Sequence, residues 1–163
     1  MSSRPSIDIR RLTADDAGIM RQLITMMGDV FDEPGHYHQA QPDDAYLRTL
    51  LARDSFIAIA ALAGDDVVGG ITAYVLPKYE QPRCEVFIYD LAVVETHRRQ
   101  GVATALINEV RRIADEVGAW IVIIEADHGE PAPDALYSKL GTREEILHFN
   151  MSPLTGAAKG HAE

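Results

Sequence analysis

Cysteine is almost absent from this sequence, since Cys84 is the only one among 163 residues. A single cysteine excludes an internal disulfide bond and suits a protein of the reducing cytoplasm. Apolar runs as long as a membrane span, about 20 residues, are missing as well. Residues 1–8 carry no apolar core of signal-peptide length. We therefore expect a globular protein of the cytoplasm.

Positive charge is also scarce. The chain holds 15 Lys and Arg residues against 25 Asp and Glu residues, a net charge of −10. Nucleic-acid binding requires a basic surface, so this balance disfavours it. A content of 47% hydrophobic and 25% charged residues is ordinary for a globular chain with a real core. We expect a single domain over residues 1–163, with 152–163 as a flexible tail.

The apolar pattern predicts an α/β protein. Apolar residues at helical spacing predict four helices, at about 13–30, 42–53, 101–117 and 132–140. Apolar or alternating runs predict six strands, at 7–13, 56–62, 67–76, 86–94, 120–125 and 144–150. The order is β-α-α-β-β-β-α-β-α-β, without an internal repeat. Gly69 and Gly70 interrupt the third strand, which indicates a bulge or a close approach of another segment.

The central strand, Val86 to Val94, contains one charged residue, Asp90. Its apolar composition predicts burial on both faces of a sheet, and simple alternation puts Asp90 on the face of Val86, Ile88 and Ala92. An unpartnered carboxylate there would cost several kcal/mol. It is therefore either solvated in a cleft, where partial burial would raise its pKa, or a structural carboxylate satisfied by arginine or backbone N–H groups.

A basic turn follows this strand and opens the next helix. It reads Arg98-Arg99-Gln100-Gly101-Val102-Ala103. A helix start has unpaired N–H groups with partial positive charge, and residues as small as Gly101 and Ala103 let a phosphate approach them. No Ser, Thr, Asn or Asp caps this start, as expected where a ligand does so. The alternative, common for so short a motif, is a plain connection with solvated arginines.

The motif Arg98-x-x-Gly101-x-Ala103 after an apolar strand resembles the acetyl-CoA motif of the GNAT N-acetyltransferase superfamily. Longer runs are similar to the small aminoglycoside 3-N-acetyltransferases (gentamicin acetyltransferase type I). These runs are 73–83, 88–93, 97–107, 135–141 and 143–149, and the resemblance covers about residues 31–150. It implies the GNAT fold, with a mixed, mostly antiparallel sheet and four helices. It also implies a homodimer that uses acetyl-CoA to acetylate the 3-amino group of gentamicin-type or sisomicin-type drugs, conferring resistance.

The resemblance also implies site residues. Asp90 and Tyr137 are the catalytic candidates, as base and as acid for the departing thiolate. Backbone N–H groups at the strand end would stabilise the thioester oxygen, and the basic turn would hold the coenzyme. The coenzyme candidates are Leu91, Ala92, Val93, Arg98, Arg99, Gln100, Gly101, Val102, Ala103 and Thr104. The acceptor candidates are Tyr79, Glu80, Asp90, Glu125 and Asp127. The loop after the first helix adds secondary candidates, which are Asp32, Glu33, His36, Tyr37 and His38. No metal is expected.

Other interpretations fit the same residues. Asp90 could be a direct base, a base through water or an anchor for an ammonium group, and Tyr137 could be a packed aromatic residue. The acidic acceptor candidates suit a polyamine equally well, so acetylation of a polyamine or a protein amino group is the second enzymatic hypothesis. A CoA-binding module without catalysis is a third. Thr142 follows Gly141 where many GNAT chains have an aromatic residue, so that packing contact must come from elsewhere.

Overall fold

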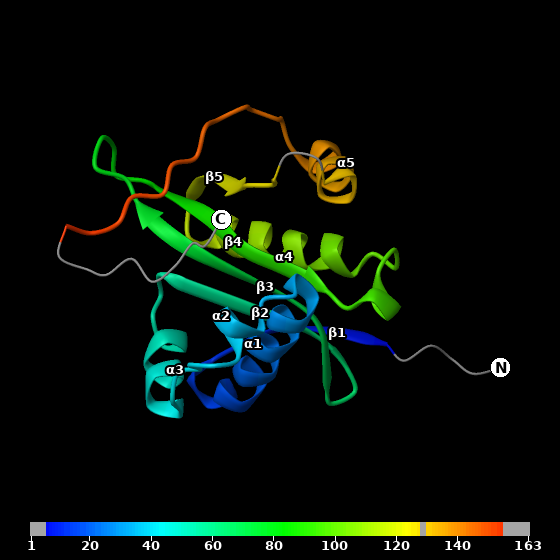
Figure 1. Cartoon of the computed structure of the whole chain (residues 1–163). Helices are drawn as coiled ribbons and strands as arrows, with labels where there is room; N and C mark the ends of the chain where they lie inside the picture. The colour runs from blue at the N-terminus through cyan, green and yellow to red at the C-terminus, as the bar shows by residue number, and fades with distance from the viewer. Residues whose placement is uncertain (1–5, 128–129, 155–163) are drawn as a thin grey trace. The chain divides into compact units, whose positions relative to one another are not determined.

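The computed structural model describes residues 6–127 and 130–154 (Figure 1). The backbone contacts divide the chain into two compact units, Met1–Glu125 and Ala126–Glu163. The first unit holds the sheet and four of the helices, and the second holds one helix and the segment that follows it. No helix in the described ranges is long and apolar enough to cross a membrane.

The sheet of the first unit has five strands in chain order. They are β1 (Ile7–Arg11), β2 (Phe56–Ala63), β3 (Asp66–Pro77), β4 (Cys84–Val93) and β5 (Ala119–Ile124). The pairings of β1 with β2, β2 with β3 and β3 with β4 are antiparallel, whereas β4 and β5 are parallel. The sheet is therefore mixed and mostly antiparallel, which confirms the fold class predicted from the sequence.

Helices cover both faces of this sheet (Figure 1). They are α1 (Ala17–Phe31), α2 (Pro34–Tyr37), α3 (Asp44–Leu51) and α4 (Val102–Glu116). Two adjacent glycines of β3 mark the two faces, because successive residues of a strand point to opposite sides. A Cβ on Gly70 would lie 2.6 Å from Cδ1 of Leu23 in α1, and one on Gly69 would lie 3.2 Å from Cγ1 of Val102 in α4.

The same glycines confirm the close approach expected from the sequence. At Gly70 a side chain would collide with Leu23 of α1, and at Gly69 it would crowd Val102 of α4 and the Ala92 carbonyl. An irregularity lies directly beside the pair, since Ala61 pairs with Gly69 while Leu62 pairs with Val67, which leaves Val68 as an extra residue. The core around α1 is completed by apolar residues of β2 and α3, which include Ala58, Ala60, Leu47 and Leu51.

Three local expectations were wrong. The segment 144–150 was expected to be a strand, but it forms no ladder in the described structure, and all seven residues are exposed. A strand forms only where it can pair with the edge of another strand, and a weakly alternating sequence does not ensure that such an edge is available. The loop after α1 contains the short helix α2, which begins at Pro34, a favourable first helical residue. Thr13 caps a single 3₁₀ turn through a capping box with Asp16, and α1 begins only at Ala17.

The second unit contains α5 (Pro131–Leu140), close to the predicted range 132–140. The other predicted helix boundaries also agree within a few residues. Asp43 caps α3, since its side chain accepts a hydrogen bond from the Tyr46 N–H. Gly118 follows α4 with φ of 70°, the left-handed conformation that favours glycine after a helix.

Candidate active site

A bulge in β4 determines where Asp90 points. Thr72 of β3 pairs with Asp90, whereas the next residue, Ala73, pairs with Ile88, so Tyr89 is an extra residue in β4. Paired residues share a face. Asp90 and Ala92 therefore lie on the face of Thr72 and Gly70, towards α1.

The predicted face of Asp90 is thereby wrong in part. Val86 and Ile88 pair with Val75 and Ala73, on the α4 side of the sheet, so only Ala92 shares a face with Asp90. Simple alternation predicts one face for all four residues, and the single extra residue inverts the pattern after Ile88. The bulge turns a strand buried on both faces into one that presents a carboxylate to the α1–α2 side.

Asp90 is half-buried, and burial raises the pKa of its carboxyl above the ordinary value. Three neighbours modify this effect. A hydrogen bond from the Tyr37 hydroxyl and the charge of His36 lower the pKa, and the charge of Glu33 raises it. No Lys or Arg within residues 6–127 and 130–154 forms an ion pair with Asp90. The carboxylate is therefore not neutralised by a lysine or arginine side chain and can accept a proton or hold an ammonium group.

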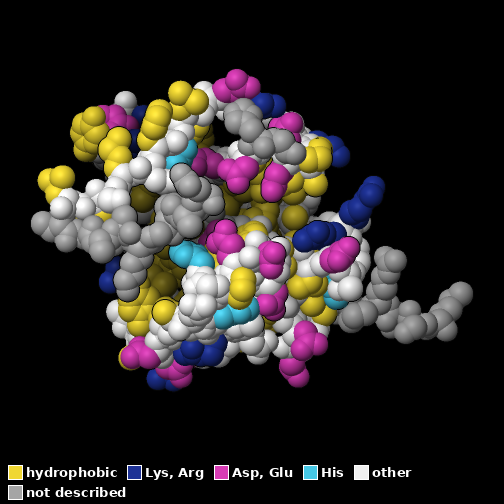
Figure 2. Space-filling model, viewed as in Figure 1, with side chains coloured by type: hydrophobic (Ala, Val, Ile, Leu, Met, Phe, Trp, Pro, Cys, Tyr) yellow, Lys and Arg dark blue, Asp and Glu magenta, His cyan; other side chains and the backbone are white. Residues whose placement is uncertain are grey.

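These neighbours come from the segment after α1, whose residues the sequence predicts only as secondary candidates for binding the acceptor. The Tyr37 hydroxyl donates to Oδ1 of Asp90 over 3.4 Å, and its own pKa is raised by burial first and then by the charge of Asp90. His38 contacts the Thr25 carbonyl of α1 at 3.0 Å. Acidic and histidine side chains gather over α1 and α2 in Figure 2. In the described ranges no three His, Cys, Asp or Glu side chains form a group that could hold a metal ion.

The edge of β4 opens beside Asp90. β5 pairs with β4 from Cys84 to Ile88 only, and in the described chain no strand pairs with residues 89–93 on that side. Backbone N–H groups alternate between the two edges of a strand. The Val94 N–H donates to the Val68 carbonyl of β3. By this alternation the N–H of Ala92 also faces β3, and those of Leu91 and Val93 face the open edge.

The basic turn is fixed at the end of this open edge. Nε of Arg98 donates to the Val93 carbonyl over 3.0 Å, and the Gln100 amide donates to the Thr96 carbonyl over 2.9 Å. Arg99 and Gly101 have φ of 58° and 83°, so the chain turns sharply before α4. No side chain caps α4, and a Cβ on Gly101 would meet nothing within 4 Å.

The start of α4 is therefore suited to an anion. The N–H groups of Val102, Ala103 and Thr104 lie in the first turn, where no carbonyl of the helix accepts from them. The space in front of Gly101 is open. A diphosphate accepts hydrogen bonds from N–H groups in this arrangement, so these residues fit the coenzyme predicted from the motif.

The predicted acceptor residues of the β3–β4 loop lie far from Asp90. Tyr79 is 99% exposed, and Glu80 forms ion pairs with Arg83 and Lys78 at 3.4 and 3.9 Å. The loop joins Pro77 to Cys84. Cys84 precedes Asp90 by six strand residues, a distance of about 20 Å. The structure thus does not bring Tyr79 and Glu80 to the carboxylate.

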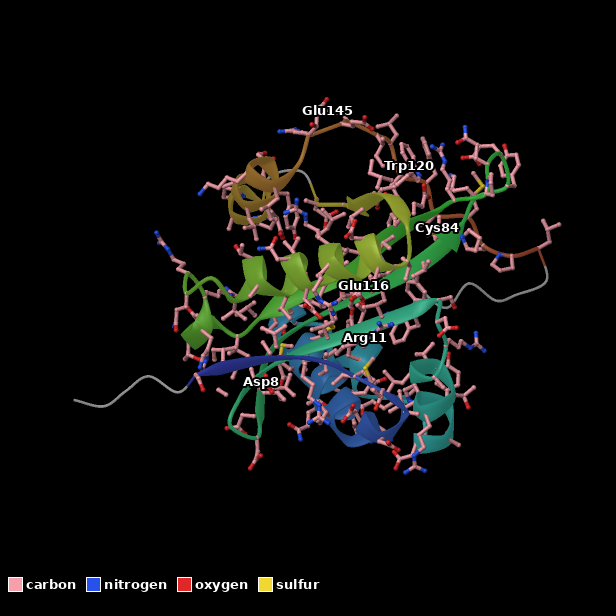
Figure 3. The ribbon with its side chains drawn as sticks, turned by 180° about the vertical axis from the view of Figure 1, so that it is seen from behind. Asp8, Arg11, Cys84, Glu116, Trp120 and Glu145 are labelled. Atoms are coloured by element: carbon pink, nitrogen blue, oxygen red, sulfur yellow. The ribbon has the colours of Figure 1, made fainter. Side chains whose placement is uncertain are left out.

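The same end of the sheet carries the single cysteine (Figure 3). Sγ of Cys84 donates to the Val117 carbonyl over 3.6 Å. The guanidinium of Arg83 stacks over the ring of Trp120 at 4.1 Å. These contacts hold the first residues of β4 against β5, which is a structural role.

The remaining predicted residues lie at or after the boundary between the units. Glu125 follows β5 directly, and Asp127 and Tyr137 belong to the second unit. Tyr137 is half-buried on α5, and burial, followed by the charge of Glu130, raises the pKa of its hydroxyl. The phenol therefore stays protonated at neutral pH, as a proton donor must.

Comparison with known proteins finds a matching family and similar structures. The model of the acetyltransferase (GNAT) family matches residues 20–142. An aminoglycoside acetyltransferase from an uncultured soil metagenomic sample has a similar structure, with a TM-score of 0.89 and 43% identity over 91% of this chain and 99% of that chain. Another one from such a sample, in complex with sisomicin, has a TM-score of 0.82 and 32% identity over 90% of this chain and 96% of that chain.

A curated relative matches in part. N-acetyltransferase 8B of Rattus norvegicus is 33% identical over 91 residues, which are 55% of this chain and 40% of that protein. The chain thus matches less than half of the length of this relative. The family model spans most of the chain. The open edge of β4, the bulge at Tyr89 and the uncapped start of α4 lie within its range. The chain belongs to the acetyltransferase (GNAT) family.

Proposed function

We propose that this protein transfers the acetyl group of acetyl-CoA to the 3-amino group of aminoglycosides of the gentamicin and sisomicin type. The observation that carries the proposal is the position of Asp90. Its half-buried carboxylate forms no ion pair with a Lys or Arg among the described residues and lies where β4 opens. The similarity to aminoglycoside acetyltransferases supports this class of acceptor.

Acetyl-CoA supplies the activated acetyl thioester in this reaction. The first turn of α4 and the side chain of Arg99 would bind its diphosphate, which would reach the helix through the open space at Gly101. Arg98 and Gln100 would act indirectly, because their side chains hold the turn. The N–H groups of Leu91 and Val93 would donate to oxygens of the bound donor, where negative charge develops on the thioester.

Asp90 would prepare the acceptor. An amine is protonated at neutral pH and attacks only when neutral. A carboxylate with a raised pKa accepts this proton directly or through water, or it anchors an ammonium group nearby. Tyr137 would return a proton to the departing thiolate, and Glu125 and Asp127 would contact further ammonium groups of the drug. With acetyl-CoA on the turn before α4 and the amine at Asp90, the two substrates would be held next to each other, which lowers the entropic cost of their encounter.

The wider setting belongs to the same proposal. The reaction consumes acetyl-CoA, so we assign it to the cytoplasm. A chain with one cysteine, which cannot form an internal disulfide bond, suits this reducing compartment. Acetylation removes a positive charge from the drug, so resistance is the expected consequence. A homodimer and a single functional domain over residues 1–163 complete the proposal.

Thiol release from acetyl-CoA in the presence of sisomicin or gentamicin tests the function. The expected result is turnover, with NMR of the product locating the acetyl group on the 3-amino nitrogen. Turnover with spermidine or a peptide, and none with either drug, would show that the protein acetylates a polyamine or a protein amino group instead. CoA binding by calorimetry, without transfer to any amine, would make it a CoA-binding module.

A further inference from the structure

Four aromatic rings form a continuous wall on the Asp90 face of the sheet. The centroids of Phe56 and Tyr74 are 5.2 Å apart, those of Tyr74 and Tyr89 are 5.8 Å apart, and those of Phe87 and Tyr89 are 6.3 Å apart. Tyr74 pairs with Phe56 on β2 and with Phe87 on β4, so these three residues share one face. Asp90 is on this face as well, because it pairs with Thr72.

The wall has a buried base and exposed tyrosines. Phe56 is buried, whereas Tyr74 and Tyr89 are 37% and 68% exposed. Their rings meet edge to face at 81°, so they form a corner rather than a flat stack. Large rings that are held rigidly and left open to solvent next to a half-buried carboxylate are suited to binding a ligand. The bulge at Tyr89 is what brings this ring and Asp90 together.

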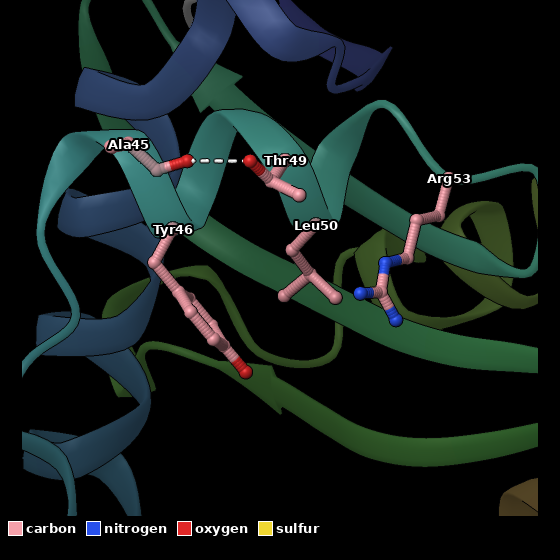
Figure 4. Close-up of a pocket in the computed structure, with 5 residues that line it drawn as sticks. All are labelled: Ala45, Tyr46, Thr49, Leu50 and Arg53. Carbon is pink, nitrogen blue, oxygen red and sulfur yellow. Dashed lines mark hydrogen bonds between the residues drawn. The ribbon is translucent and has the colours of Figure 1, made fainter.

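Helix α3 flanks the wall. Tyr46, which is 59% exposed, leaves α3 on the same side as Leu50 and Arg53, and these residues line a hollow of about 280 Å³ (Figure 4). Burial, followed by the charges of Tyr89, Tyr46 and Asp90, raises the pKa of Tyr74. Arg53 makes the far end of the hollow unfavourable for a polycation. The hollow itself is therefore a poor site for a cationic ligand, in contrast to the tyrosine rings on the Asp90 face.

We propose that Tyr74 and Tyr89 form an acceptor subsite, in which they hold the apolar face of an amino-sugar ring while Asp90 meets one of its amines. This inference rests on the proposed function and names the part of the site that recognises the drug. An amino-sugar ring combines a C–H face with protonated amines, and the face of a tyrosine ring binds both. Asp90 and Glu33 add the negative charge that such a ligand requires. An acyclic polyamine has charges but no ring face to place in the corner.

Tyr89→Ala tests the subsite, because Tyr89 is the most exposed ring of the wall. We expect its KM for sisomicin, and its Kd measured by calorimetry on the CoA-loaded protein, to rise about three- to tenfold. The KM for acetyl-CoA, and the Kd for spermidine measured by the same calorimetry, should stay within twofold of wild type. Tyr89→Phe keeps the ring and should restore most of the lost affinity. Val117→Ala, which truncates an exposed apolar residue at the far end of α4, is the control.

The outcomes separate this inference from the function on which it rests. An unchanged sisomicin affinity in Tyr89→Ala, or an equal loss for spermidine, overturns the subsite and leaves the enzyme assignment intact. Sisomicin binding that weakens in Tyr89→Ala, in a protein that never acetylates the drug, supports the subsite and overturns the proposed function. A wild-type protein that does not bind sisomicin overturns both.

Discussion

The hydroxyl of Tyr37 reaches Oδ1 of Asp90 over 3.4 Å, across 53 positions of the sequence. This hydrogen bond connects α2 to the bulged part of β4. It opposes the effect of burial, because a donor to the carboxylate favours its charged form. Tyr37 is therefore a positioning residue for Asp90, and it also adjusts the pH at which this group is ionised.

Tyr37→Phe should shift the acid limb of the kcat/KM profile to higher pH. Without the hydrogen bond, the pKa of Asp90 rises further, and a base with a higher pKa needs a higher pH to be ionised. Glu33, which also raises this pKa, and His36, which lowers it, stay in place. The ring of Phe keeps the packing against Phe31, so folding should be preserved. A pH–rate profile with the acid limb unmoved would remove Tyr37 from this role.

Asp90→Asn should lower turnover and raise thermal stability. As Asp90 is the proposed general base, its loss should reduce the rate by at least about tenfold. Burial raises the folded-state pKa of Asp90 above its unfolded value. The ionised carboxylate is thus unfavourable in the folded state above the folded pKa, and this penalty disappears below the unfolded pKa. Melting at neutral pH and at acid pH checks the sign, since only the neutral-pH difference should be large. Wild-type turnover would exclude Asp90 from catalysis.

Gly28→Ala should disturb the site from within α1. A Cβ at Gly28 would lie 2.5 Å from Nε2 of His38 and 2.7 Å from Cβ of Tyr37. Relief of this clash moves α2 away from α1 and weakens the contact of Tyr37 with Asp90. We expect a loss of about 1–3 kcal/mol in the free energy of unfolding and a several-fold lower kcat/KM. Gly18→Ala is the matched control, because it lies on the same helix with open space around it.

The control should behave in the opposite direction. Alanine is a better helix former than glycine, so Gly18→Ala should stabilise the protein by up to about 1 kcal/mol. Urea unfolding and steady-state kinetics on both variants make the comparison. Equal kinetics for the two variants would show that α2 does not need its close contact with α1 to keep Asp90 in place.

Most of the sheet could be predicted from the sequence, and part of the site could not. The strands β2, β3 and β4 are long apolar runs, and such runs predict buried strands whatever the pairing register is. The extra residue at Tyr89 leaves no mark on composition, so the face of Asp90 and the neighbourhood of Tyr74 follow only from the pairing register. Segment 144–150 alternates like a strand but lacks a partner in the described chain.

Besides Asp90, the one charge in an apolar run, the parts of the site that the sequence predicts are those built from local backbone. The turn before α4 is such a case, because Gly101 signals a positive φ and the lack of a capping side chain is readable directly. Tyr37 is the opposite case. Its partner lies 53 positions away, and α2 is a helix of four residues inside what reads as a loop. Contacts of this kind depend on how α1 packs on the sheet.

Gly101→Ala tests whether the turn before α4 binds the coenzyme. Gly101 has φ of 83°, Gly64 of the β2–β3 turn has φ of 65°, and neither position has an atom within 4 Å of an added Cβ. Both substitutions to alanine should therefore lose a similar amount of stability, about 1–2 kcal/mol, from the left-handed backbone. Only Gly101→Ala places a methyl group where the diphosphate approaches α4, so only this variant should raise the KM for acetyl-CoA several-fold. Thermal melts and initial rates over a range of acetyl-CoA concentrations measure both effects. An equal KM in the two variants would mean that the open space at Gly101 is not the path of the coenzyme.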